Sequence, residues 1–236
     1  MDRKIILSIL AAALMGFIGV WLLLSLKPPT APSGPPRLPW DVTRSEAGQV
    51  EVFGLTLGES RLAELQGLLS EPGKLSLFVE PGGSMSVEAF FDDVILSQIR
   101  ADWVVTLQVP AAELEAIYQR GTRISGLGNG ARKVTLAPAD STRLAQAPLR
   151  RLTYLPWKRL EARDLAGNFG EPAEILSEET GILHWLYPEV GMDIARDPDG
   201  AVVIQYLNAD DFLAARARLL AAKSTAGEAE TPLELR

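Results

Sequence analysis

The sequence predicts an α+β protein: an N-terminal transmembrane helix, then a periplasmic region of two similar halves, each a short helix followed by an antiparallel meander. Three observations lead to this prediction. Residues 5–26 form a long uncharged apolar run, residues 27–39 are rich in proline, and the rest of the chain twice shows helical apolar spacing followed by alternating strands. The 236 residues include no cysteine, so the folded part must be stabilised by its apolar core and not by disulfides.

The apolar run at residues 5–26 is long enough to cross a hydrocarbon core of ~30 Å as one helix, at about 1.5 Å per residue. A cleaved signal peptide has a shorter core of ~7–15 residues and a small-residue cleavage site at its end, so we expect an uncleaved signal anchor. Arg3 and Lys4 precede the run, and only Lys27 follows it closely. Because positive flanks stay in the cytoplasm, we expect a single-pass protein of the bacterial inner membrane with its C-terminal region in the periplasm.

One face of this predicted span carries small residues, which are Ser8, Ala12, Gly16 and Gly19. Such a face allows close approach of a second helix and is the candidate helix-packing surface, through which a homo-oligomer could form. A helix that merely tolerates small residues is the alternative. The first predicted partner is the lipid bilayer itself.

Composition divides the chain into seven segments. They are a cytoplasmic head at 1–4, the transmembrane helix at 5–26, a proline-rich linker at 27–47, a first α+β half at 48–109, a connecting helix and glycine-rich loop at 110–148, a second α+β half at 149–212, and a C-terminal helix with an acidic tail at 213–236. Proline removes backbone donors and favours extended chain, so we interpret the linker as a spacer and not as a ligand for a proline-binding domain.

In the first half, the capping-box spacing from Thr56 to Glu59 predicts a helix that begins there and continues through the leucines of residues 62–69. Alternation predicts strands at 75–79 and 85–91, separated by a turn at 81–83. Asp92 and Asp93 predict a second turn, followed by one or two strands within residues 94–109. The connecting segment predicts a helix at 110–120 and a glycine-rich hairpin or loop at 121–133, which lacks the G-x-G-x-x-G phosphate pattern. Further strands are expected at 133–136 and 149–155.

The second half repeats this order, with a helix at 160–169 and strands at 173–177, 182–187, 192–196 and 201–207, before a helix from Phe212. Four residues of each half fall in the same register: Leu65, Gly67, Glu71 and Pro72 in the first, and Leu165, Gly167, Glu171 and Pro172 in the second. A duplication accounts for this match, and so does the chemistry that ends helices in general.

The charge and the scarcity of histidine restrict the chemistry. The net charge of −7 argues against nucleic acid, which requires clustered Lys and Arg. His184 is the one histidine, so a His-rich metal site is excluded and His-based catalysis is not expected. We expect a non-enzymatic protein with no catalytic residue, no metal and no cofactor.

The candidate partner contacts are an aromatic group near the end of a predicted strand: His184, Trp185, Tyr187 and Pro188. Aromatic residues are favoured at interaction hot spots, and they are equally ordinary in the core of a small sheet, which is the alternative.

The segments GLTLGESRLAELQGLLSEP in the first half, and LAGNFGEP with HWLYP in the second, resemble the repeat of the SmpA/OmlA-like (BamE-type) envelope proteins, small outer-membrane lipoproteins that assist β-barrel assembly. This chain departs from the family at its anchor, because it has no cysteine to carry a lipid. The resemblance implies a membrane-anchored periplasmic adaptor or scaffold that contacts other proteins of the bacterial cell envelope. The alternative is a small-ligand carrier or enzyme that uses a cleft between the two halves, with His184 or nearby carboxylates as polar contacts.

Overall fold

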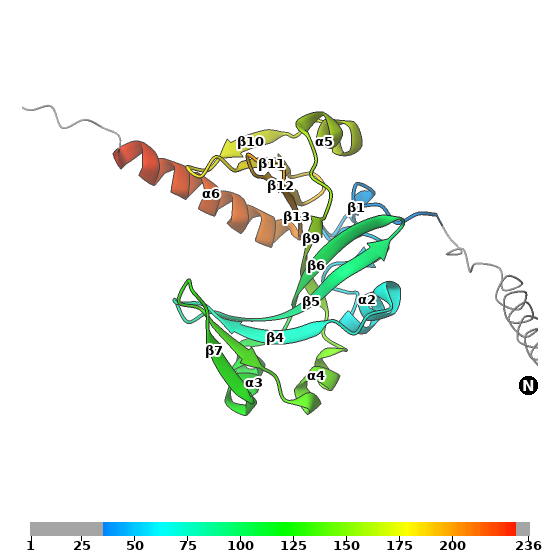
Figure 1. Cartoon of the computed structure of the whole chain (residues 1–236), viewed down its shortest axis with the longest axis vertical. Coiled ribbons are helices and arrows are strands. Elements are labelled where there is room, and N and C mark those ends of the chain that lie inside the picture. Colours follow the sequence, from blue (N-terminus) through cyan, green and yellow to red (C-terminus); the bar gives the residue numbers. More distant parts are fainter. Residues whose placement is uncertain (1–34, 230–236) are drawn as a thin grey trace, which may run out of the picture. The chain divides into compact units, whose positions relative to one another are not determined.

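The computed structural model describes residues 35–229, with side chains up to residue 221. The chain divides into two units, Met1–Pro36 and Arg37–Arg236, and nearly all described residues belong to the second. This second unit contains a three-stranded sheet and a ten-stranded antiparallel sheet, together with the helices α2 to α6 (Figure 1).

The ten strands lie in the order β10-β11-β12-β13-β9-β6-β5-β4-β8-β7. Their bounds are β4 Lys74–Val79, β5 Met85–Leu96, β6 Ile99–Leu107, β7 Arg123–Gly126, β8 Arg132–Thr135, β9 Leu149–Pro156, β10 Glu174–Ser177, β11 Leu183–Tyr187, β12 Met192–Arg196 and β13 Val202–Leu207. The small sheet consists of β1 Val42–Arg44, β2 Val50–Val52 and β3 Leu55–Thr56. The helices are α2 Leu62–Leu69, α3 Ala111–Arg120, α4 Pro138–Leu144, α5 Ala162–Phe169 and α6 Ala209–Ala229.

The predicted fold class of two similar helix-then-meander α+β halves is wrong. The meander β4 to β6 and the meander β10 to β13 do exist, but β9 pairs with β6 on one side and with β13 on the other, so both belong to one continuous sheet. Their buried apolar residues form one main core. The described part of the protein is therefore mostly β. The two meanders join because β9 pairs with an edge strand of each, and these edges would be left unpaired in two separate halves.

The predicted membrane anchor is also corrected. Within residues 35–229, no helix is both long enough and apolar enough to cross a bilayer. The predicted span at 5–26 and its small-residue face, Ser8, Ala12, Gly16 and Gly19, lie outside the described residues. The structure therefore gives no support to a single-pass, signal-anchored inner-membrane protein or to the periplasmic localisation that depended on the anchor.

The main core lies on one face of the ten-stranded sheet, beneath α2, α3, α4, α5 and the small sheet. Its centre is aromatic: the Phe53 ring lies 4.5 Å from Trp103 and 5.4 Å from Tyr154, and Trp103 and Tyr154 meet edge to face. Tyr206 is fully buried beside them and donates a hydrogen bond of 2.6 Å to the Pro39 carbonyl oxygen. The segment before β1 is thereby attached to the sheet.

Two local predictions differ from the structure. The helix predicted from Thr56 begins at Leu62 instead, because Thr56 belongs to β3 and the Glu64 carboxylate accepts a hydrogen bond of 2.9 Å from the backbone N–H of Arg61, the residue before the helix. The turn predicted at Asp92 and Asp93 is an irregularity within the long strand β5, where Asp93 adopts a φ of 58° and its N–H donates to the Asp102 carboxylate at 2.8 Å. The small sheet and α4 were not predicted.

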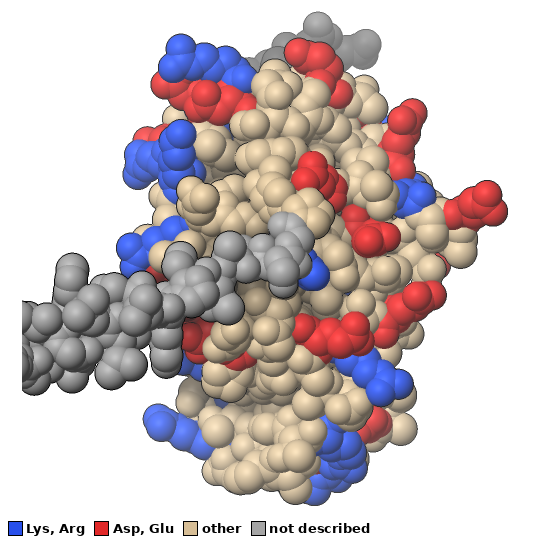
Figure 2. Space-filling model, turned by 90° about the vertical axis from the view of Figure 1, so that its right-hand side faces the viewer, with Lys and Arg blue, Asp and Glu red and all other residues tan. Residues whose placement is uncertain are grey.

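The surface mixes charges of both signs. On the side shown in Figure 2, Lys and Arg side chains lie in small groups close to Asp and Glu, and large uncharged areas separate them.

Candidate functional site

The second face of the ten-stranded sheet, here called the outer face, can be followed through the strand register. Lys74 pairs with Phe90, Phe90 with Val104, and Val104 with Thr153. The same row then continues across β13, β12, β11 and β10 through Gln205, Asp193, Leu186 and Glu174. Because directly paired residues point to the same side of a sheet, all of these side chains lie on the outer face.

Helix α6 covers one end of the outer face, alongside β10 to β13 (Figure 1). Phe212 of α6 packs in a small cluster with Leu176, Leu186 and Leu207, separate from the main core. Two ion pairs hold the helix there, from Arg216 to Glu174 and from Arg150 to Asp211, each at 2.7 Å.

The other end of the outer face is exposed and forms what we call the open patch. Its seven residues enclose a hollow of about 270 Å³ and are Lys74, Ser76, Phe78, Glu88, Phe90, Val104 and Lys133. The buried side chains of α2 to α5 belong to the main core on the opposite face, and Phe90 remains 36 % exposed. Apolar side chains therefore meet solvent here, on strands whose other face carries residues of the main core.

Two lysines stand over the two aromatic rings of the open patch. Lys74 Nζ lies 6.0 Å from the centre of the Phe90 ring, and Lys133 Nζ lies 5.9 Å from that of Phe78. Such cation–π contacts hold the alkyl stems along the rings and leave the ammonium groups in solvent. Lys74 also forms an ion pair of 2.9 Å with Asp92.

Glu88 is the acidic group of the open patch. It is half-buried and accepts a hydrogen bond of 3.4 Å from the Ser86 hydroxyl. Burial raises the pKa of the Glu88 carboxyl, and the Arg151 guanidinium acts in the opposite direction. Glu88 and Arg151 are both register partners of Thr106, so all three lie in one row of the outer face, which ends at Arg123 on the edge strand β7.

The outer face continues to the tip of the β5–β6 hairpin, where Ile95 pairs with Arg100. The Arg100 guanidinium stacks 3.8 Å from the Trp157 ring, whose Nε1 donates to Asp102 at 3.0 Å. Trp157 is 50 % exposed. The exposed apolar surface thus extends beyond the open patch along the same face.

The structure does not gather the four predicted contact residues at one surface. His184 lies on the outer face, 7 % exposed, with Nδ1 at 3.0 Å from both carboxylate oxygens of Asp193 and Nε2 at 3.1 Å from Glu178. Both ring nitrogens therefore face acceptors, which favours the doubly protonated imidazolium, and Asp193, followed by Glu178, raises the pKa of His184. Neither nitrogen is free to act as a base.

Trp185 and Tyr187 point to the opposite face, into the main core. The Tyr187 hydroxyl donates to the Gly170 carbonyl at 2.9 Å, and burial raises the pKa of Tyr187 to about 12. Pro188 is exposed, and its carbonyl accepts a hydrogen bond from Arg44. Trp185 and Tyr187 are therefore core residues, which is the alternative that the sequence left open for the aromatic group.

Sequence reasoning missed the open patch. A signal was present in the adjacent apolar pairs, Leu77 with Phe78 and Phe90 with Phe91, because neighbouring residues in a strand point to opposite faces. A strand with apolar side chains on both faces is either buried on both sides or exposes one apolar face, and the sequence does not separate these two cases.

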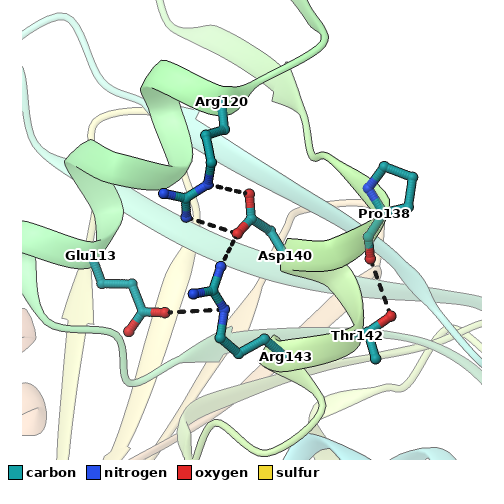
Figure 3. Close-up of polar contacts among 6 residues, drawn as sticks. All are labelled: Glu113, Arg120, Pro138, Asp140, Thr142 and Arg143. Atoms are coloured by element: carbon teal, nitrogen blue, oxygen red, sulfur yellow. Dashed lines mark hydrogen bonds and ion pairs between the residues drawn. The ribbon is translucent and has the colours of Figure 1, made fainter.

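A second polar cluster joins α3 to α4 (Figure 3). Arg120 donates two hydrogen bonds to Asp140, at 3.1 and 2.8 Å, and Arg143 donates to the same carboxylate. Glu113 lies 3.9 Å from Arg143. Asp140 is 1 % exposed, and the hydrogen bonds from Arg120, reinforced by Arg143, lower its pKa. The two guanidinium groups balance two carboxylates, so the cluster fixes α4 against α3.

A groove of about 580 Å³ lies beside this cluster and includes Gln108, Pro110, Glu113, Arg143 and Gln146. Its charged groups are paired with each other or with Asp140, and Gln146 accepts a hydrogen bond from Arg61 at 2.9 Å. The charged side chains and Gln146 in this groove are therefore already engaged in contacts that stabilise the fold.

Among residues 35–221, no group of three or more His, Cys, Asp or Glu side chains is placed to hold a metal ion. No known protein family, curated protein or solved structure matches the chain.

Proposed function

We propose that this protein is a protein-binding module, an adaptor that acts by contact, and that the open patch docks an acidic segment with apolar side chains from another protein. The observation that carries the proposal is the unequal covering of the outer face: α6 packs over its β10–β13 end, whereas Phe78, Phe90 and Val104 lie uncovered at the other end. Exposed apolar patches bordered by polar groups are typical of interaction surfaces.

Charge complementarity supports an acidic partner segment. The chain has a net charge of −7, yet this end of the outer face carries Lys74, Lys133, Arg123 and Arg151. Its carboxylates are Glu88, which is half-buried, Asp92, which is paired with Lys74, and the exposed Glu80 just after β4, whose charge adds to the raised pKa of Glu88. A segment with Asp or Glu beside its apolar residues would meet cations at the rim and aromatic rings at the centre, which is the usual anatomy of an interface.

The adaptor role is the one implied by the resemblance to SmpA/OmlA-like repeats. The proposal retains that role without the anchor and without a location in the cell. It requires a contact surface and no catalytic group.

The test places a photo-crosslinking amino acid at Phe90, with a matched control at Ile175, an exposed apolar residue that is 52 % accessible at the other end of the sheet. The expected result is a protein crosslinked at position 90 and not at 175, through a segment rich in Asp, Glu and apolar residues. With that partner purified, Lys133→Glu should weaken binding at least tenfold, and Ile175→Asp should not.

Three results would refute the proposal. Equal crosslinking of the same proteins at positions 90 and 175 would show that the open patch has no selectivity. A crosslinked segment that is basic, or binding that Lys133→Glu leaves unchanged, would contradict the role of charge. Circular dichroism and thermal unfolding of each variant confirm that the fold is intact.

A further inference from the structure

The hollow of the open patch has the size of one large side chain. Its volume of about 270 Å³ lies below the range of ~300–1,000 Å³ that is usual for small-molecule sites. Aromatic side chains bury ~150–250 Å² each and dominate interface hot spots. On the premise that the proposed function holds, the hollow is suited to a single anchoring residue of the docked segment.

The walls and the floor of the hollow differ in chemistry. Phe78, Phe90 and Val104 offer apolar contact, and two phenyl rings favour an aromatic guest in edge-to-face or offset geometry. Besides the two lysines at the rim, the polar lining is Ser76, which is buried, and Glu88. A carboxylate has about four acceptor positions, and among the described residues the Ser86 hydroxyl supplies one hydrogen bond to Glu88.

This acceptor restricts which residue can serve as the anchor. A purely apolar side chain would remove water from Glu88 without replacing its hydrogen bonds, which is costly. An acidic side chain would be repelled by the carboxylate. A Lys or Arg side chain would meet Glu88 favourably but would have to pass Lys74 and Lys133 at the rim. An aromatic side chain with its own donor, the tyrosine hydroxyl or the tryptophan indole N–H, satisfies both the walls and the carboxylate.

We propose that the open patch recognises a tyrosine or tryptophan flanked by acidic residues, with the aromatic side chain in the hollow, its O–H or N–H donating to Glu88, and the flanking carboxylates meeting Lys133 and Lys74. Lys133 is the stronger contact of the two, because Lys74 already shares its charge with Asp92. Burial, with a smaller contribution from the Glu80 charge, raises the pKa of Glu88, so a donor from the docked residue would stabilise its carboxylate form.

The experiment measures the affinity of the full-length protein for fluorescent nonapeptides that differ only at their centre. Each has two Asp residues on either side of a central Tyr, Trp, Phe, Glu or Lys, and one further peptide has Lys in place of all four Asp. The Tyr and Trp peptides should bind about tenfold more tightly than the Phe peptide, the gain typical of a hydrogen bond to a charged group. The Glu-centred and Lys-flanked peptides should bind most weakly.

Protein variants assign the effect to the hollow. Glu88→Gln should reduce the preference for Tyr over Phe to within about threefold and improve binding of the Glu-centred peptide, whereas Glu189→Gln, at an exposed glutamate in the turn after β11, should change neither. A structural role of Glu88 alone would weaken all peptides equally and leave their order unchanged.

The inference and the proposed function fail separately. Equal affinities for the Tyr and Phe peptides, or no binding of the Tyr peptide at millimolar concentration, would overturn the inference, and selective crosslinking at position 90 would then still support docking at the open patch. Absence of that selective crosslink would remove both.

Discussion

Replacement of His184 by Gln tests the buried ion cluster of the outer face through the pH dependence of stability. In the wild-type protein Asp193 and Glu178 raise the pKa of His184 above its ordinary value of 6.5, so the folded state holds this proton more tightly than the unfolded state. The stabilisation is complete below about pH 6.5 and is lost as the pH rises through the folded-state pKa. Stability should therefore decrease with rising pH in this range.

The single proton that His184 binds limits how steeply the free energy of unfolding can change with pH. The free energy of unfolding changes by at most about 1.4 kcal/mol per pH unit for each proton that the two states bind differently. Because His184 is 7 % exposed and Asp193 is 3 % exposed, solvent screens the pair little. At pH 6.5 the unfolded histidine is half protonated, so the slope there is at most half of that limit, and it steepens at higher pH for as long as the folded state keeps its proton. The chain has one histidine and no cysteine, so few other side chains titrate between pH 6.5 and 8.

The assay is urea unfolding at several pH values between 5.5 and 9, for the wild type and for His184→Gln. The variant should lose the downward slope, and Asp193→Asn should reduce it. The proton NMR signal of the single imidazole reports its pKa directly. A wild-type stability that is constant or rises from pH 6.5 to 8, or an imidazole that titrates at or below 6.5, would refute the assignment of a buried imidazolium.

Three further substitutions test the packing by denaturant unfolding. Asp140→Asn should lower the free energy of unfolding by about 1–3 kcal/mol at pH 7, because two guanidinium groups lose their shared carboxylate, and the difference should vanish as the pH falls through the lowered pKa of Asp140, below 3.8. Gly191→Ala should cost more than about 1 kcal/mol, because φ is +67° and the new Cβ would overlap the Leu207 carbonyl oxygen. Tyr206→Phe should cost about 1–3 kcal/mol by leaving the Pro39 carbonyl without its donor.

Two control substitutions should not lower the free energy of unfolding. Gly67→Ala, within α2 and with open space around it, should stabilise the protein by about 0.5–1 kcal/mol. Asp41→Asn, at an exposed site, should leave stability unchanged. A loss for Asp140→Asn that does not decrease as the pH is lowered below 3.8, a neutral Gly191→Ala, or a Tyr206→Phe as stable as the wild type would each contradict the contact on which its prediction depends.

Alternation and turn residues predicted most of the strands of the large sheet. The strands of the second meander lie within a residue of their predicted bounds, because each is short and ends at a strong turn such as Asp197 to Gly200. The helix at 110–120 was found at Ala111–Arg120 for a similar reason, since Pro110 begins it and Gly121 ends it.

The errors arose where a local signal competed with a tertiary contact. Asp92 and Asp93 have the composition of a turn, yet β6 pairs with β5 on both sides of them, and Asp102 accepts the Asp93 N–H. Thr56 has the spacing of a helix cap, but its backbone pairs with Glu51 in the small sheet. In both cases the competing partner is separated in sequence and is therefore invisible to a pattern confined to a few residues.

The candidate site shows the same division. His184 was visible as the single histidine, but its carboxylate partners come from β12 and from the turn after β10, so only the folded sheet shows that both ring nitrogens are engaged. Phe78, Phe90 and Lys133 are ordinary strand residues in the sequence. They form one surface because β4 pairs with β5 and β8, and they are exposed because α6 lies over the other end of the sheet.

The sequence by itself determined the local elements of this protein, since strand alternation, turns and helix ends depend on neighbouring residues: the meander strands, the helix at 110–120 and the isolated histidine. The tertiary structure alone decided that β9 joins both meanders into one sheet, that Trp185 and Tyr187 enter the core, and that Phe90 remains at the surface. The physical reason is that pairing between distant strands and the covering of a face are set by the competition of all elements for the same apolar area, which short-range periodicity does not record.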